Sequence, residues 1–231
     1  MSSESERSLN HFALYRFKDA YWQLPEEARD KFLRTWLSAL RGTAEKVELY
    51  QVFPMQSRVD FVAWSALALQ DQDTTAGFFK KAAQALNPHR RFIEPINTLW
   101  GYTSSTTYSH ARSAQEIDPF SNSRKKYLVI YPFVKTKEWY LLGKDARQGM
   151  MNEHIRLGKT YSKISQLLLY SFGVQNQEFV VVYETDDLPL FSDLVRDLRE
   201  TDGRLYTERD TPLHSAIYCP DEEFFELWKS T

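Results

Sequence analysis

His154 is the residue of this sequence whose surroundings most favour chemistry. Met150 precedes it by four residues and Leu157 follows it by three, so the imidazole shares the apolar stripe of a predicted helix and should point inward. An inward imidazole can bind a metal ion, although a single buried histidine is more often an ordinary hydrogen-bonding residue of the core. The spacing alone leaves both interpretations open.

Other common catalytic and metal-binding patterns do not occur in the sequence. The single cysteine, Cys219, excludes an intrachain disulfide and a cysteine-rich metal site, and there is no CxxCH motif. A glycine-rich phosphate loop, a GxSxG motif and a cysteine–histidine nucleophile pair are also missing, which disfavours a hydrolase or a nucleotide enzyme. The other histidines have no partner at metal-ligand spacing, and we expect them to be structural or surface residues: His11, His89, His110 and His214.

The composition is that of a globular protein with a surplus of aromatic side chains. Hydrophobic residues make up 42% of the 231 residues and aromatic residues 15%, enough for a large core and for subunit contacts or a planar ligand. The formal net charge of -2 gives no support for a nucleic-acid or anionic-membrane partner. The N-terminus has no apolar signal region, and no run approaches the roughly 18 apolar residues of a membrane span. We therefore expect a cytoplasmic protein.

The first half of the chain alternates between strand and helix patterns. A strand-like segment at 11–18 is followed by a helix that begins at Pro25, presents one apolar face and stops at Gly42. The remaining predicted elements are strand, strand, helix and strand, at 46–53, 59–67, 74–87 and 99–109. The order β-α-β-β-α-β is that of a ferredoxin-like repeat.

The same order returns in the second half. A polar, serine-rich stretch at 105–126 reads as a linker between a first repeat, residues 1–104, and a second repeat, residues 127–231. The predicted elements of the second repeat are a strand, a helix, two strands, a helix and a strand, at 127–135, 145–158, 162–172, 178–185, 188–200 and 214–219. We therefore predict an α+β fold of two tandem ferredoxin-like repeats whose sheets pack together.

An ordered series of blocks in the second half resembles a known family. The chlorite dismutase-like haem proteins, which include the coproheme decarboxylases of haem biosynthesis, have similar sequence in YPFVKTKEWYLL, MMNEHIRLGKTY, SQLLLYSFG, EFVVVYETDDLPLFSDLVRDLR and RLYTERDTP. The match covers most of residues 128–218, whereas the first half resembles the family in layout and in blocks such as LWGYTSSTTYS. The resemblance implies a subunit of the dimeric α+β barrel type and a homopentamer.

The resemblance also implies an iron tetrapyrrole, haem b or coproheme, in the second repeat. His154 would be the proximal ligand of the iron and would leave the sixth position open. Lys135 matches a lysine on the same side, near the propionates. Lys159 and Arg199 match cationic positions at the propionate end, and Trp139 is expected to pack near the pocket.

The sequence departs from the family at three positions near this predicted site. The glutamate that usually supports the proximal histidine is replaced by Asp202 as the nearest carboxylate, whose shorter side chain would weaken that support. Arg204 stands where some decarboxylases have a small hydroxyl residue, and Phe133 where some relatives have methionine.

Two residues match catalytic positions of the family. Gln166 stands where chlorite-decomposing members have an arginine, and an amide cannot neutralise a hypohalite anion; glutamine there resembles the coproheme decarboxylases. Tyr131 matches the tyrosine that those decarboxylases oxidise to a radical beside a reacting propionate. Without the resemblance, Gln166 could equally be a polar residue of a half-exposed strand, and Tyr131 a core or interface residue.

The resemblance thus favours peroxide-dependent oxidative decarboxylation of two coproheme propionates to give haem b, with coproheme and hydrogen peroxide as partners. Two alternatives stay open. The first is a chlorite-decomposing or peroxidase-type haem enzyme, and the second is a non-enzymatic haem-binding protein or a barrel relative that has lost the haem.

Overall fold

The computed structural model describes residues 7–104 and 114–230, and its first half contains one β-α-β-β-α-β unit. The elements of this half are β1 (Ser8–Phe17), α1 (Asp19–Trp22), α2 (Glu26–Arg41), β2 (Lys46–Gln51), β3 (Phe61–Ala68), α3 (Thr74–Leu86), the 3-10 turn η1 (Asn87–His89) and β4 (Ile93–Tyr102). The helix α2 begins directly after Pro25. Acidic residues in its first turn and Arg41 in its last turn interact favourably with the helix dipole and stabilise the helix.

The second half repeats this order with additional short elements. It contains β5 (Tyr127–Lys135), α4 (Lys137–Leu141), α5 (Lys144–Thr160), β6 (Ser165–Tyr170), β7 (Phe179–Thr185), α6 (Leu188–Leu198), the 3-10 turn η2 (Asp202–Tyr206), β8 (Thr207–Arg209), β9 (His214–Tyr218) and α7 (Asp221–Lys229). Asp187 caps α6, because its Oδ1 accepts a hydrogen bond of 3.0 Å from the backbone N–H of Leu190. The predicted α+β fold is confirmed.

Within the described ranges, the strands form one nine-stranded sheet in the order β7-β6-β4-β1-β3-β2-β9-β5-β8. Because β5 also pairs with β7, the strands other than β8 close into a barrel. The two halves meet at short seams, where Tyr50 pairs with Tyr218 and Tyr102 with Tyr170. Gly101 lies at the second seam, where a Cβ would come within 2.6 Å of the Ser171 Oγ, so the close approach of the two strands requires glycine.

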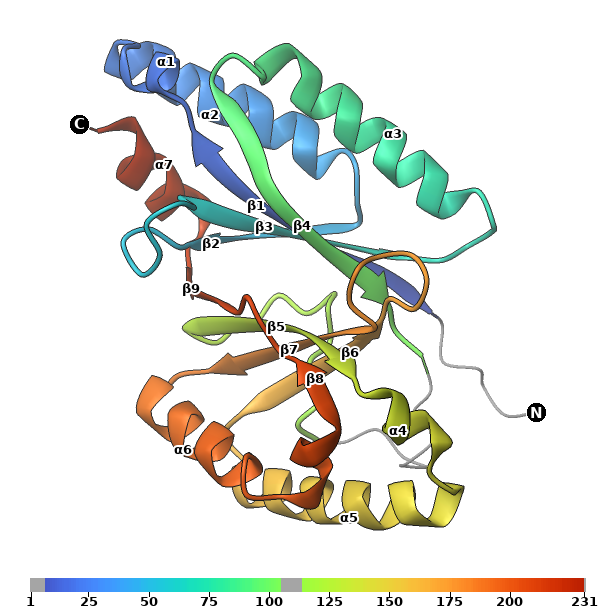
Figure 1. Ribbon diagram of the computed structural model, residues 1–231. Helices are drawn as coiled ribbons and strands as arrows, with labels where there is room; N and C mark the ends of the chain where they lie inside the picture. The colour runs from blue at the N-terminus through green and yellow to red at the C-terminus, as the bar shows by residue number, and fades with distance from the viewer. Residues whose placement is uncertain (1–6, 105–113, 231) are drawn as a thin grey trace.

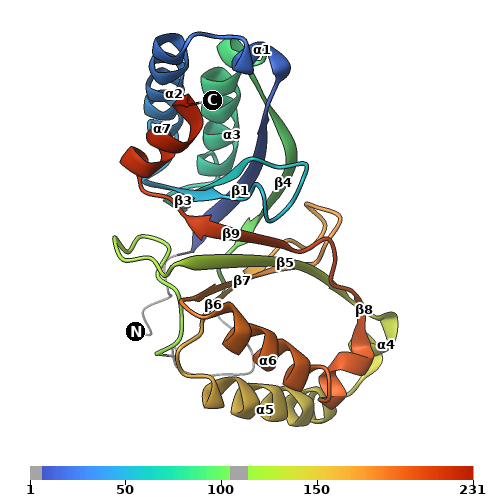
Figure 2. The ribbon, with the colours of Figure 1, turned by 90° about the vertical axis from the view of Figure 1, so that its left-hand side faces the viewer.

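Helices cover the outer faces of the barrel, α2, α3 and α7 on the first half and α5 and α6 on the second (Figure 1, Figure 2). The barrel interior is a continuous apolar core from both halves, which includes Phe12, Trp64, Leu128 and Leu169. A second core fills the space under α2 and α7, whereas the core under α5 and α6 has fewer buried members. In the described ranges, no helix is both long and apolar enough to span a membrane.

Most predicted elements lie where the sequence placed them, and β4 is the largest difference. The strand begins at Ile93 instead of Leu99, and Pro95 lies inside it. Proline cannot donate a ladder hydrogen bond, but the β1–β4 register shifts between Leu14 and Tyr15, beside Pro95, so that the strand accommodates it. The strand ends at Tyr102, and residues 105–109 of its predicted extension lie outside the described residues.

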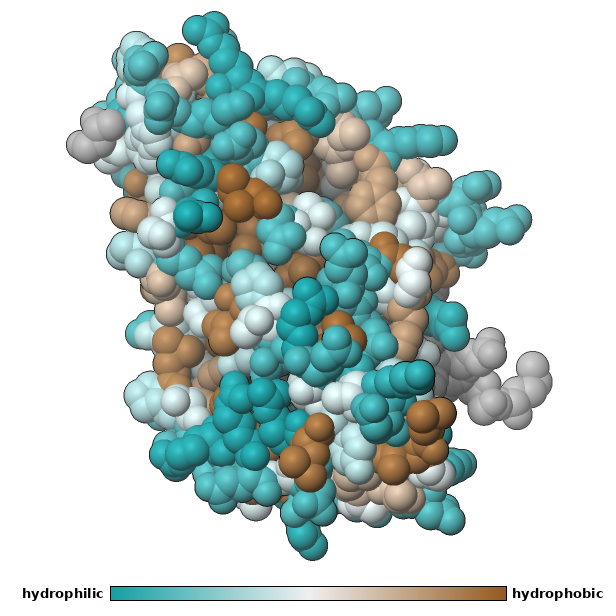
Figure 3. Space-filling model, in the orientation of Figure 1, coloured by the Kyte–Doolittle hydropathy of each residue, from teal (hydrophilic) through white to brown (hydrophobic). Residues whose placement is uncertain are grey.

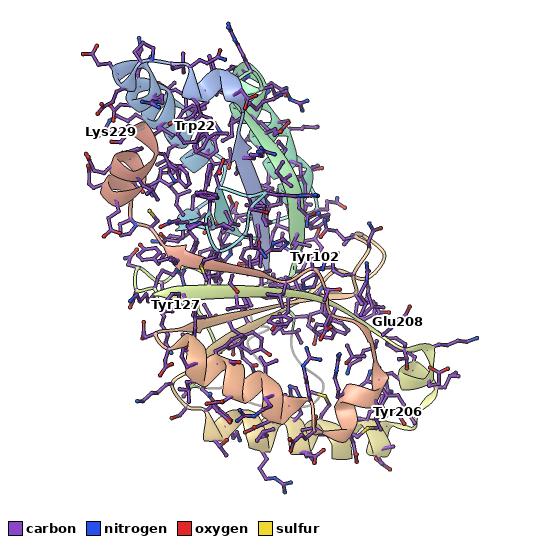
Figure 4. All side chains as sticks on the ribbon, turned by 60° about the vertical axis from the view of Figure 1, so that its left-hand side comes forward. Trp22, Tyr102, Tyr127, Tyr206, Glu208 and Lys229 are labelled. Atoms are coloured by element: carbon purple, nitrogen blue, oxygen red, sulfur yellow. The ribbon has the colours of Figure 1, made fainter. Side chains whose placement is uncertain are left out.

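The C-terminal helix α7 was not predicted, and it returns to the first half. Phe224 and Trp228 are buried in the core under α2, and the Tyr21 hydroxyl donates a 2.7 Å hydrogen bond to the Trp228 carbonyl oxygen. Figure 4 shows Trp22 and Lys229 at the same end of the molecule, where α1 and α7 meet. The chain therefore closes its first unit with its last helix, and the boundaries 1–104 and 127–231 stay a prediction.

The described part of the predicted linker, residues 114–126, packs against both halves, since Gln115 contacts the second half and Arg124 contacts Glu48 of the first and Glu184 of the second. The Gln115 Nε2 atom donates to the carbonyl oxygens of Tyr161 and Ile164, each at 3.0 Å. Ile117 is buried, and the side chain of Arg124 is 1% exposed. A polar composition thus predicted the absence of regular structure better than it predicted solvent exposure.

Candidate functional site

A pocket lies between the outer face of the second half-sheet and the helices α5 and α6. Its walls come from β5, β6, β7, both helices, and the segment 199–210 that contains η2 and β8 (Figure 2). The apolar part of the lining contains Phe133, Met151, Leu168, Val181, Val195 and Leu198. The polar part contains His154, Tyr131, Lys135, Arg199, Arg204 and Asp210. An apolar chamber with a few charged groups at one side suits a large planar ligand with acidic substituents.

His154 projects into this pocket from α5, as its place on the Met150–Leu157 stripe predicted. Burial, together with the positive charge of Lys135, holds the pKa of the imidazole below its usual range, and the negative charge of Glu153 opposes this shift. The ring is therefore neutral near pH 7 and has a lone pair available for a metal. No group of three or more His, Cys, Asp or Glu side chains within the described ranges could hold a bare metal ion. One imidazole in an apolar pocket fits a metal whose other ligands come from a macrocycle.

Lys135 lies at the end of β5 and extends along one wall of the pocket. Its Nζ atom donates to the Gly203 carbonyl oxygen at 3.1 Å and lies 4.5 Å from the centroid of the Trp139 ring. Burial and the neighbouring Arg204 guanidinium lower the pKa of Lys135 to about 8. The amine thus carries a positive charge at neutral pH but loses it readily above pH 8. Trp139 is buried and is not part of the pocket lining. Its ring contacts the Lys135 ammonium group through a cation–π interaction.

Tyr131 faces the charged side of the pocket from the middle of β5. Burial raises the pKa of its phenol, the Arg199 guanidinium lowers it, and the Asp210 carboxylate raises it. The ring packs against Tyr183 and Phe191, each with a centroid distance of 6.2 Å. The phenol is therefore protonated at neutral pH and lies within the field of two opposite charges.

Besides Trp139, two predicted site residues are not part of the pocket lining. Lys159 is exposed at the end of α5. At 3.6 residues per turn it points about 140° away from His154 around the helix, so its position does not favour a pocket contact. Gln166 is also exposed, but it lies on the same face of β6 as Leu168, which does line the pocket. Its backbone pairs with Gln115 and Ile117 of the linker.

Asp202 contacts α5 through its backbone, and support of His154 by its side chain stays a prediction. Its side chain is exposed, and its backbone N–H donates to the Glu153 Oε2 atom at 3.2 Å. Within the described ranges, the charges that act on the imidazole are those of Lys135 and Glu153. Glu153 thus holds the start of η2 against α5, and it is the carboxylate that this structure places near the histidine.

Sequence reasoning missed several lining residues, of which Met151 and Asp210 matter most. Met151 lies three residues before His154, so helical spacing could have identified it. Asp210 follows a three-residue strand in a segment with no periodicity, and nothing in the sequence marked it. Its Oδ2 atom lies 3.1 Å from Arg204 Nη1 and 3.6 Å from Arg199 Nη2.

The closed barrel, with a histidine-containing pocket under α5 and α6, places the protein in the class of α+β-barrel proteins. The family model for chlorite dismutase matches residues 26–218, and this chain belongs to the chlorite dismutase family. A curated coproheme decarboxylase from Mycolicibacterium smegmatis is 29% identical over 172 residues, which is 73% of this chain and 71% of the relative.

Solved structures agree with this fold. The chlorite dismutase of Candidatus Nitrospira defluvii in complex with imidazole superposes with a TM-score of 0.82 at 22% identity, covering 96% of this chain and 95% of that structure. A single-residue variant of the same enzyme gives a TM-score of 0.82 at 21% identity, with the same coverage. At these identities the likeness describes the fold.

Proposed function

We propose that this protein binds an iron tetrapyrrole through His154 and oxidatively decarboxylates coproheme to haem b, with hydrogen peroxide as the oxidant. The observation that carries the proposal is the convergence, in one apolar pocket, of a neutral imidazole with three cationic side chains: Lys135, Arg199 and Arg204. A macrocycle with several carboxylates needs both features. The curated coproheme decarboxylase among the relatives supports the same assignment.

The residues present fit such a group in their donor chemistry. A protonated imidazole could not act as a ligand, and burial keeps His154 neutral. The apolar side chains from β6, β7, α5 and α6 can pack on the faces of the ring. Guanidinium and ammonium groups form charge-assisted hydrogen bonds with carboxylates, so the cations of the 199–210 wall and Lys135 would hold the propionates.

The proposed reaction balances for each propionate. The propionate side chain loses carbon dioxide, one hydrogen atom and one electron and becomes a vinyl group. The hydrogen atom, the electron and one proton reduce one hydrogen peroxide to two water molecules. When bound, the iron tetrapyrrole would supply the redox chemistry, so coproheme is both substrate and cofactor. Two such rounds convert coproheme to haem b.

The protein's own residues would hold the propionates in position and pass the oxidation to them. Arg199 would hold a propionate carboxylate near Tyr131, whose phenol lies in the field of this guanidinium. Tyr131 would lose its Oη proton together with an electron, and then regain a hydrogen atom from the adjacent propionate side chain. Lys135, a neighbour of Arg204, would hold a second carboxylate and would be protonated below about pH 8.

Chlorite decomposition is the second candidate, because the family model and the solved structures carry that name. Gln166 disfavours it: a neutral amide can donate a hydrogen bond but cannot neutralise an anion beside the metal. Gln166 lies on the same face of β6 as Leu168, which lines the pocket, and this supports a position beside the bound tetrapyrrole. Little or no oxygen release from chlorite by the haem-loaded protein is therefore expected, and sustained turnover would reverse the order of the two functions.

We further propose that the protein assembles as a homo-oligomer of about five subunits. The space-filling view shows apolar side chains at the surface in patches among hydrophilic ones (Figure 3). Leu141 and Leu205, in the second half, are 75% and 77% exposed, and subunit contacts over them would remove this apolar area from water. The number of five subunits follows from the resemblance to the family. Light scattering should give a mass near five times 27.2 kDa, and a clean monomer at micromolar concentration would count against this assembly.

The experiment that tests the proposed function is a pair of absorption titrations of the purified protein. Saturable binding of coproheme with the spectrum of a five-coordinate, histidine-ligated iron is expected, with weaker or comparable binding of haem b. Failure to bind either tetrapyrrole would remove the proposal and leave a barrel relative without this cofactor.

A further inference from the structure

Asp210 is the only carboxylate in the lining of the described pocket. It does not face a single cation, because its Oδ2 atom lies 3.1 Å from Arg204 Nη1 and 3.6 Å from Arg199 Nη2. Two guanidinium groups that share one carboxylate carry a net charge of one positive unit. Each guanidinium has five N–H donors, so both keep donors for another acceptor.

The three side chains come from one continuous wall of the pocket. Arg199 ends α6, Arg204 lies in η2, and Asp210 directly follows β8 (Figure 2). The wall is anchored at two points, since β8 pairs with the end of β5 and the start of η2 is held by Glu153. Figure 4 shows Tyr206, at the end of η2, and Glu208, in β8, along this wall. The backbone of the wall is thus held by contacts that do not involve the side chains of these three residues.

We propose that Asp210 is a specificity-determining residue, which limits the arginine pair to a single carboxylate of the bound tetrapyrrole. The inference rests on the proposed function and deepens it. With Asp210 present, the first substrate carboxylate meets one net positive charge. A second carboxylate at the same place would meet none, and it would be repelled by two negative groups.

Tyr131 lies beside the place where the arginine pair would hold this single carboxylate. Both Arg199 and Asp210 lie close enough to the phenol to shift its pKa in opposite directions. A carboxylate held by the pair is therefore beside Tyr131, and its neighbours on the ring are directed elsewhere, for example to Lys135. The trio would present one propionate at a time to the tyrosine.

A purely structural role for Asp210 makes a different prediction. The side chains of Arg199, Arg204 and Asp210 are 49%, 33% and 23% exposed, and partly exposed ion pairs contribute little to stability. If Asp210 only tied the wall together, its loss would loosen the arginines and weaken ligand binding. If it limits the charge, its loss would strengthen binding.

The test uses ferric coproheme without peroxide, titrated into the full-length protein and followed by absorbance at two salt concentrations. Asp210→Asn raises the net charge of the trio by one, and the dissociation constant should fall about threefold to tenfold with a steeper salt dependence. Arg204→Gln lowers the charge by one and should weaken binding by a similar factor. The double variant restores the net charge of wild type and should return to within about twofold of its affinity, because the two opposite charge changes cancel.

Asp193→Asn is the matched control. It removes the same charge from an exposed ion pair of α6 with Arg196, at 3.0 Å, outside the pocket lining. Its affinity should equal that of wild type. Weaker or unchanged binding by Asp210→Asn, or a double variant weaker than both single variants, would overturn the inference while leaving the proposed function in place. Wild-type protein that binds no coproheme would overturn both.

Discussion

Helices α2 and α5 occupy the same place in the two repeats, but their contributions to the core differ. Six residues of α2 are buried, among them Phe32, Leu33 and Trp36, and aromatic rings under this helix pack edge to face. No residue of α5, which is described throughout, is fully buried. Met151 and His154 of this helix point toward the sheet, but they line a pocket there. One repeat fills the space with side chains, and the other leaves a pocket.

This contrast explains how one architecture can serve two purposes. Burial of large side chains supplies most of the stability of a domain, so the first repeat, with α7 added to it, can stabilise the barrel. The second repeat shares the barrel interior and can therefore leave its outer space incompletely filled. A planar ligand in this space would supply the missing core.

The largest effect on stability should come from removing a buried side chain from the core under α2. Trp36 is 0% exposed, and Trp36→Ala should lower the free energy of unfolding by about 3–5 kcal/mol, because it removes a large buried ring and leaves a void. Met151→Ala is the control on the open side, where the side chain borders an existing pocket, and should cost less than about 1 kcal/mol. Urea unfolding of both variants tests the contrast, and equal losses would show that the two cores are filled alike.

His154→Ala tests the open side directly. Without the imidazole the protein should lose the five-coordinate, histidine-ligated spectrum on addition of coproheme, while its unfolding midpoint without ligand should change little, since the ring is only partly buried. Absorption spectroscopy of the variant provides the measurement. A spectrum identical to that of wild type would move the metal site elsewhere in the chain.

A smaller effect is expected from titration of Lys135, whose pKa is lowered to about 8. A carboxylate ligand binds the protonated amine, so affinity for coproheme should be constant below this pKa and should fall as the pH rises through 8. The loss of one charged hydrogen bond corresponds to about tenfold. Titrations at pH 7 and pH 9 measure it, and Lys135→Met should bind weakly at both values. A wild-type affinity that rises with pH would contradict this role.

Tyr131→Phe should have the smallest effect on binding. The ring and its contacts with Tyr183 and Phe191 are kept, and at most one hydrogen bond of about 0.5–1.5 kcal/mol is lost. Turnover should fall much further than binding, because phenylalanine has no phenolic proton to release. A variant that decarboxylates as fast as wild type would remove Tyr131 from the mechanism.

The parts of this fold that were predictable are those with strong periodicity. The apolar faces of α2 and α6 and the apolar runs of β5 and β7 predicted the elements, and the helical spacing placed His154 inward. The break at Pro95 hid the first part of β4, because propensity argues against a proline that the register shift accommodates. The closure of the barrel depends on pairing between distant strands, which no local pattern encodes.

The site was predictable where it lies on regular elements. Tyr131 and Lys135 on β5 and Arg199 at the end of α6 do line one pocket, as the resemblance implied, whereas their roles stay a prediction. Lys159 was placed by resemblance alone, although helical geometry directs it away from His154. The sequence could not identify Asp210 as a site residue. It is brought to the arginines by the short elements η2 and β8, whose sequence has no hydrophobic periodicity.

The most direct test of the central claim is addition of hydrogen peroxide, in small equivalents, to the wild-type complex with coproheme, followed by mass spectrometry of the tetrapyrrole. The proposed function predicts successive losses of the mass of one carboxyl group and one hydrogen atom. A three-propionate intermediate should accumulate first and haem b second, at about one peroxide for each loss. Bleaching of coproheme without either product would contradict the decarboxylase and leave a peroxidase-type or haem-binding protein.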